Sequence, residues 1–150
     1  MSRRPSARRP SPLGLVALAL TFASAVALVW VTGIASGGFS TFGTGSGELL
    51  GDVAFLGWDF SPVVGLAVVV LVVDRRCPLG RAALLAGTVV FAGFLAFTLA
   101  DFLASDSSTS ALVFVFLPIP LWTLVLLTGG VAVLVQDVRG RRAGAPAALG

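Results

Sequence analysis

The residues that this chain lacks exclude most kinds of catalytic chemistry. It contains no histidine, lysine, tyrosine or asparagine, and only one cysteine, Cys77. Without histidine there is no imidazole general base, no histidine-ligated haem and no histidine metal site. The sequence also has no glycine-rich phosphate loop and no nucleophile elbow. We therefore predict that the protein is not an enzyme, and that it holds no cofactor and no metal.

Charged residues are scarce as well. They make up 11% of the 150 residues, whereas a soluble domain carries about a quarter. Hydrophobic residues account for 57%, and the mean hydropathy is +1.01. So few polar side chains cannot cover a compact globule in water, and the charges cluster between long apolar stretches. The composition predicts an integral membrane protein.

Four apolar segments are long enough to cross a hydrocarbon core of about 30 Å at about 1.5 Å per residue. They are residues 13–34, 53–73, 81–103 and 111–135. We predict an all-α, up-and-down bundle of four transmembrane helices without a soluble domain. The basic ends, residues 1–12 and 136–150, are rich in proline, glycine or alanine and are expected to be disordered.

Two further expectations concern these segments. The connection at residues 74–80 is short, which predicts that the second and third spans are antiparallel neighbours. The first span resembles a signal peptide in its basic start and small residues. Its apolar run continues to Val31, past the two small-residue stretches at residues 23–25 and 25–27 that resemble cleavage sites. An uncleaved membrane anchor is therefore favoured, with a cleaved signal as the alternative.

The arginines predict the orientation. All ten basic residues are arginines. They lie in the N-terminal arm, around the connection that holds Arg75, Arg76 and Arg81, and in the C-terminal tail. Positive residues stay on the cytoplasmic side of a membrane, so we predict a plasma-membrane protein with both termini in the cytoplasm. Arginines beside spans meet anionic lipid headgroups. We therefore expect the lipid bilayer as a partner and no nucleic acid.

The single cysteine falls in the connection that we place in the cytoplasm. Cys77 cannot form an intramolecular disulfide, and the cytoplasm is reducing. The neighbouring arginines could lower the pKa of a thiol, but without histidine no base accompanies it. We expect an ordinary free thiol.

Two carboxylates near the outer side form the candidate site. Asp59 lies in the sequence Trp58-Asp59-Phe60-Ser61-Pro62, roughly one helical turn below the outer interface, and Asp101 has a similar depth. Proline has no N–H, so each helical proline leaves a carbonyl without its donor. Broken helices with a carboxylate and free carbonyls coordinate cations in membrane proteins. The predicted ion or proton site consists of Asp59, Asp101, Pro62, Pro118 and Pro120.

The same residues fit a second interpretation, which we take as the default. Ser61 and Pro62 can be the N-cap and first residue of the second helix, which leaves Asp59 solvated outside it. Pro118 can open the fourth helix in the same way. Asp101 is then a water-facing residue at a helix end.

Small residues recur at a spacing of four on two spans. They are Ala19, Ala23 and Ala27 on the first span, and Ala83 and Gly87 on the third. This spacing lets helix backbones approach closely in a membrane. We expect packing within the bundle, with a subunit interface as the alternative.

Short motifs also recur at the span ends. The first and third spans begin with similar motifs, Pro12-Leu13-Gly14 and Pro78-Leu79-Gly80. The second and fourth spans are followed by Asp74 and Asp137. Two copies of one helical hairpin would produce this pattern. Apolar helices of biased composition would also resemble one another, and we keep that as the default.

Two classes of function remain. We favour a non-enzymatic interaction or accessory subunit, which works with a membrane-protein partner or as a homo-oligomer. The alternative is a small ion or proton transporter or channel with its site near Asp59 and Asp101. Whether these carboxylates face the bundle interior or the solvent distinguishes the two classes.

Overall fold

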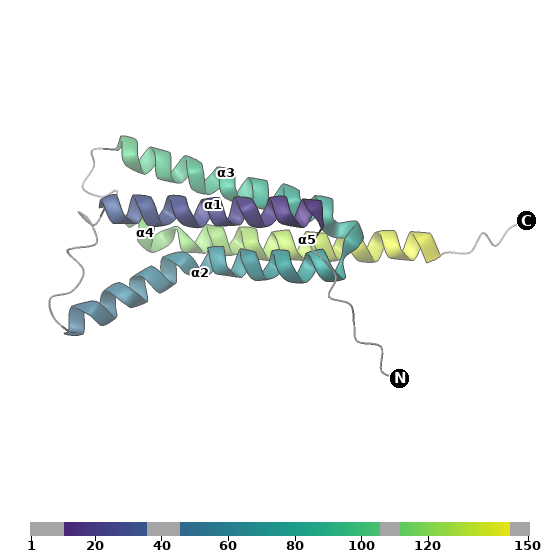
Figure 1. The fold of residues 1–150 in the computed structure, drawn as a ribbon, viewed down its shortest axis with the longest axis horizontal. Helices are drawn as coiled ribbons and strands as arrows, with labels where there is room; N and C mark the ends of the chain where they lie inside the picture. Colours follow the sequence, from purple (N-terminus) through teal and green to yellow (C-terminus); the bar gives the residue numbers. More distant parts are fainter. Residues whose placement is uncertain (1–10, 36–45, 106–111, 145–150) are drawn as a thin grey trace, which may run out of the picture.

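The computed structural model describes residues 11–35, 46–105 and 112–144, which form helices and no strand. The long helices are α1 (Pro12–Ala35), α2 (Ser46–Arg76), α3 (Arg81–Ala104) and α5 (Pro118–Gly144). A short helix, α4 (Leu112–Phe116), precedes α5, and a 3₁₀ turn, η2 (Pro78–Gly80), joins α2 to α3. Figure 1 shows the four long helices lying side by side, with the start of α1 and the end of α5 towards the same end of the bundle. The predicted all-α bundle is confirmed.

Each long helix contains a segment that can cross a membrane. The four segments are 22 to 29 residues long and carry a mean hydropathy of 2.0 to 2.3: Pro12–Gly33, Val53–Arg76, Pro78–Ala104 and Phe114–Arg142. About a third or less of each segment is buried inside the bundle. The remaining apolar side chains face outward, as in a protein whose outer surface contacts lipid.

The helices form a ring in the order α1, α2, α5, α3. α1 packs against α2 and α3, and α5 packs against the same two helices. α2 and α3 are consecutive and antiparallel, but they touch much less, so our prediction that they are packing neighbours is confirmed only in part. The cause is η2, which packs mainly against α5 and so takes the chain across the bundle.

The bundle interior is filled by large apolar side chains from all four long helices. Those below 2% exposure include Leu28, Leu66, Val70, Leu84, Phe91, Leu95, Leu121 and Val125. Lipid tails are as apolar as these side chains, so the hydrophobic effect gives little drive for helix association in a bilayer. Van der Waals contact between closely approaching helices is therefore the main source of cohesion.

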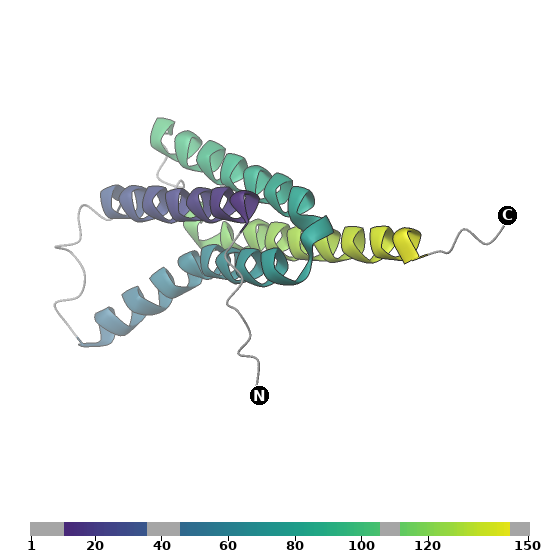
Figure 2. The same cartoon turned by 45° about the vertical axis from the view of Figure 1, so that its right-hand side comes forward.

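α2 continues through its proline, which corrects our default interpretation of Ser61 and Pro62 as a helix start. Pro62 lies inside α2, and the Ser61 hydroxyl donates a hydrogen bond of 2.8 Å to the Trp58 carbonyl. This is the carbonyl that Pro62 cannot serve. α2 bends away from the bundle along its first half, as both Figure 1 and Figure 2 show. Proline is an established cause of such bends.

Two boundaries also differ from the prediction. α2 begins at Ser46, inside the segment that we expected as a loop, and α5 runs to Gly144. The disorder predicted for residues 136–150 is therefore wrong for residues 136–144. In this extension the Gln136 side chain accepts a 2.9 Å hydrogen bond from Leu79 N, and Arg141 pairs with Asp137 at 2.8 Å. The arm at residues 1–10 and the tail at residues 145–150 lie outside the described residues.

The arrangement of the hairpins bears on the repeated motifs. A tandem repeat with a twofold axis along the bundle would place the matching helices α1 and α3 diagonally. Here α1 and α3 are adjacent, and so are α2 and α5. The two hairpins are therefore not related by such an axis, and duplication stays the alternative to the default of a resemblance by composition.

The turn between α2 and α3 requires a residue without a side chain. A Cβ atom on Gly80 would lie 2.3 Å from the carbonyl oxygen of Ala132 on α5. An atom there would collide with backbone, which cannot rotate away as a side chain can. Gly80 thus lets η2 lie against α5.

We expect Gly80→Ala to lower the stability of the bundle by about 1–3 kcal/mol, because overpacking forces the helices apart. The measurement is thermal unfolding in detergent, followed by circular dichroism. Gly93→Ala is the matched control, because a Cβ atom there meets nothing within 4 Å. An equal loss in both variants would contradict the role of the η2–α5 contact.

Candidate functional site

Asp59 faces the bundle interior. It is 1% exposed and continues the buried stripe of α2 that includes Val63, Leu66, Val70 and Val73. Steps of three and four residues keep these positions on one helix face. Our default interpretation, in which Asp59 is solvated outside the helix, is therefore wrong.

Neither carboxylate oxygen of Asp59 has a hydrogen-bond partner among the described residues. An isolated carboxylate is very costly to bury. A buried carboxyl group without a partner is therefore favoured in its protonated form or with a bound cation. This makes Asp59 the chemically unusual residue of the membrane-spanning region.

Hydrogen bonds hold the bent part of α2 beside Asp59 against α4 and α5. The indole Nε1 of Trp122 donates to the Ser61 hydroxyl at 2.9 Å, and Ser61 donates to the Trp58 carbonyl. The indole Nε1 of Trp58 donates to the Val115 carbonyl at 3.0 Å, close to the break between α4 and α5. The Trp58 carbonyl therefore already accepts a hydrogen bond from Ser61 and is not a free ligand for a cation.

The prolines of the predicted site fall in different environments. Pro62 and Pro118 are each below 2% exposure, whereas Pro120 is exposed. Pro118 is the first residue of α5, which is the position that the default interpretation expected.

Asp101 is exposed on α3 and does not join Asp59. The buried stripe of α3 ends with Leu95 and Leu99. Asp101 follows Leu99 by two residues, which is roughly 200° around a helix. The predicted site with two carboxylates is therefore not formed, and of its five residues only Asp59, Pro62 and Pro118 are buried.

A second buried carboxylate was not singled out from the sequence. Asp74 is 4% exposed and accepts hydrogen bonds from the backbone N–H of Ser11, at 3.0 Å, and from the Ser11 hydroxyl. Nε of Arg81 lies 3.0 Å from its Oδ1. Arg81 also donates to the Asp74 carbonyl, at 2.9 Å from Nη2. Asp74 thereby joins the start of α1, the end of α2 and the start of α3.

The N-cap and first turn of α1 leave space for the Asp74 side chain. The Ser11 hydroxyl accepts a 2.9 Å hydrogen bond from Gly14 N, so Ser11 is the N-cap and Pro12 the first helical residue. A Cβ atom on Gly14 would lie 2.5 Å from Cγ of Asp74. The serine–proline pair at residues 11–12 is the sequence signal for this cap, and only the folded chain brings residue 74 to it.

The buried carboxylates Asp59 and Asp74 of α2 therefore differ in kind. Asp74 is fully paired and structural, whereas Asp59 has no partner among the described residues. Comparison with protein-family models, with curated proteins and with solved structures finds no match to this chain. Function must therefore be argued from the site itself.

We expect Asp74→Asn to destabilise the protein by about 1–3 kcal/mol, because it weakens charge-assisted hydrogen bonds to Ser11 and Arg81. Thermal unfolding in detergent measures the change. Asp137→Asn is the control, since its exposed pair with Arg141 contributes about 0.5 kcal/mol or less. Similar unfolding temperatures for the two variants would show that the Asp74 cluster does not hold the helices together.

Proposed function

We propose that this small membrane protein is a non-enzymatic transporter of protons or small monovalent cations, with Asp59 as the binding group. One observation carries the proposal: Asp59 is buried in the bundle interior, and neither of its carboxylate oxygens has a partner among the described residues. Ionisable residues inside a membrane bundle commonly mark ion or proton pathways. The outward position of Asp101 limits the proposal to a site with one carboxylate.

The depth of Asp59 fits such a site. Asp59 precedes Arg76 by 17 residues, which is about 25 Å of helix. In a hydrocarbon core of about 30 Å it would lie close to the side away from the arginines. A proton or cation can reach this depth from that side more readily than from the arginine side, where Asp74 and Arg81 are paired.

We expect Asp59→Asn to reduce the flux of protons or cations across the vesicle membrane to the level of protein-free vesicles. The asparagine amide can neither release a proton nor neutralise a cation. The assay follows a pH-sensitive dye inside vesicles that contain the purified full-length chain, under an imposed potential. Asparagine has nearly the same shape as aspartate, so the variant preserves packing.

Asp101→Asn is the control, and its flux should match that of the unaltered protein because Asp101 is exposed. Undiminished flux in Asp59→Asn would remove Asp59 from the pathway. A wild-type protein that transports neither protons nor sodium nor potassium would contradict the transport proposal.

An interaction or accessory subunit is the second candidate, and the outer face of α1 favours it. Ala19 and Ala23, two residues of the small-residue stripe, are exposed, and Ala27 is half-buried. Gly87 on α3 instead packs against Thr128, where a Cβ atom would lie 2.3 Å from Oγ1. The stripe on α1 is therefore open to a helix of another membrane protein or of a second copy.

The proposed orientation places both termini in the cytoplasm of a cell whose plasma membrane holds the protein. It is supported by the described arginines, which lie at the α2–α3 connection and in the last turns of α5. These segments lie towards the end of the bundle at which α1 begins (Figure 1). The positive-inside rule puts that end in the cytoplasm.

The native cysteine can test this orientation. We expect a membrane-impermeant maleimide to leave Cys77 unlabelled in intact cells and to label it after permeabilisation, because Cys77 precedes η2 at the arginine end. A variant with Cys77→Ser and Ser105→Cys moves the thiol to the end of α3 and should be labelled in intact cells. The reverse labelling pattern would overturn the orientation.

A further inference from the structure

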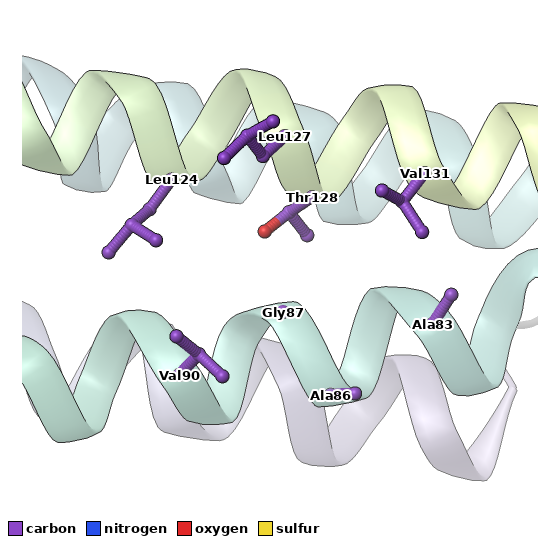
Figure 3. Close-up of a pocket in the computed structure, with 8 residues that line it drawn as sticks. All are labelled: Ala83, Ala86, Gly87, Val90, Leu124, Leu127, Thr128 and Val131. Carbon is purple, nitrogen blue, oxygen red and sulfur yellow. The ribbon is translucent and has the colours of Figure 1, made fainter.

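A groove runs between α3 and α5 on the outer surface of the bundle. It encloses about 340 Å³ and is lined by Ala83, Ala86, Gly87, Val90, Leu124, Leu127, Thr128 and Val131. Figure 3 shows the α5 side chains Leu124 and Thr128 directed towards α3, with Val90 and Ala83 directed back towards α5. Gly87 and Thr128 make the close contact between the helices. Val90, Leu127 and Val131 are exposed, so the groove opens outward, where lipid lies.

The groove occupies the half of the membrane next to the arginines. From Arg81 to Val90 is nine residues, which is about 14 Å along α3. Half of a hydrocarbon core is about 15 Å thick. The lining itself runs from Ala83 to Val90, about 10 Å, so the groove lies within one leaflet and can accept part of an extended acyl chain.

Arginines follow this groove along α5. α5 projects beyond the other helices at this end (Figure 1), and it carries Arg139, Arg141 and Arg142 there. Arg139 reaches back to the start of α3, with Nη1 3.5 Å from the Leu79 carbonyl. That contact uses one of its five donors. Arg141 is paired with Asp137, and Arg142 is exposed without an acidic partner among the described residues.

We propose that this groove binds an anionic phospholipid, with one acyl chain between α3 and α5 and the phosphate at Arg139 and Arg142. Arginine forms strong paired hydrogen bonds with phosphate. Basic sites between transmembrane helices on the cytoplasmic side recognise anionic headgroups. The apolar lining matches the chain, and the guanidinium groups of Arg139 and Arg142, which have no acidic partner among the described residues, match the headgroup.

A second groove shows why charge decides the occupant. Between α1 and α2 a groove of about 420 Å³ is lined by Leu18, Thr21, Phe22, Ala25, Phe60, Val63, Val64 and Ala67. Its nearest residue on α2, Ala67, is nine residues from Arg76, or about 14 Å. The α3–α5 groove begins closer to an arginine, because Ala83 in its lining follows Leu79, whose carbonyl Arg139 contacts, by four residues. An apolar chain can enter either groove, but among the described residues the α3–α5 groove has the arginine closest to its lining.

The test measures lipid bound to the purified full-length chain by native mass spectrometry after reconstitution in an equimolar mixture of phosphatidylglycerol and phosphatidylcholine. We expect one retained phosphatidylglycerol per chain. Ala86→Phe, which fills the groove from an exposed position, should abolish retention of either lipid. The double variant Arg139→Gln and Arg142→Gln keeps the groove and should lower the preference for phosphatidylglycerol by about fivefold for each arginine.

Ala96→Phe is the matched control, because Ala96 is exposed on α3 outside the groove. It should retain phosphatidylglycerol as the unaltered chain does. Equal retention of the two lipids by the unaltered chain would overturn the proposal, as would equal loss in Ala96→Phe and Ala86→Phe. A change in the number of chains per particle in Ala86→Phe, without lipid loss, would instead assign the groove to a second copy. Because Asp59 is not varied, failure here leaves the transport proposal untouched.

Discussion

Inside a bilayer, water cannot satisfy a backbone N–H or carbonyl, so every such group must find its partner within the protein. This constraint explains the polar side chains that the chain places among its apolar residues. The Ser11 hydroxyl accepts a hydrogen bond from a backbone N–H at the start of α1. The Ser61 hydroxyl donates to the carbonyl that Pro62 leaves without a donor, and the Gln136 side chain accepts from a backbone N–H of the η2 turn. At each of these three places a side chain supplies the partner that the backbone lacks. The bend of α2 is therefore a stable feature, because Ser61 and Trp122 hold it in place.

Asp59 is the exception among these polar side chains, because its carboxylate oxygens have no partner among the described residues. The other buried carboxylate, Asp74, accepts from a backbone N–H and a hydroxyl and lies against a guanidinium. A protein that needed Asp59 only for structure could have surrounded it in the same way. An unpaired buried acid lowers stability, and such costs are concentrated at functional sites. The contrast between the two residues is the reason to assign function to one and structure to the other.

The two ends of the bundle consequently have different tasks. At the arginine end, Asp74, Arg81, Gly80 and Gln136 fix the helices in close contact. Towards the other end, α2 bends away, and the interior contains Asp59, which has no partner among the described residues. At that end, Trp58 and Trp122 join the bent part of α2 to α4 and α5 by hydrogen bonds.

The sequence by itself determined the number of spans, the all-α class and the grouping of the arginines. These depend on local composition and length, which a linear chain displays directly. The rotation of each helix about its axis could not be predicted. The helices are apolar on all sides, so no polar stripe marks which face is buried. The sequence therefore left open that Asp59 faces inward and Asp101 outward.

The same limit applies to Pro62 and to the order of the helices. Whether a proline starts a helix or bends it depends on a partner for the freed carbonyl, and Trp122, which holds Ser61 in place, lies 61 residues away. Whether α3 packs beside α2 or across from it depends on the contact of Gly80 with Ala132. These choices were made by tertiary packing, because they are set by close approach between segments distant in the chain.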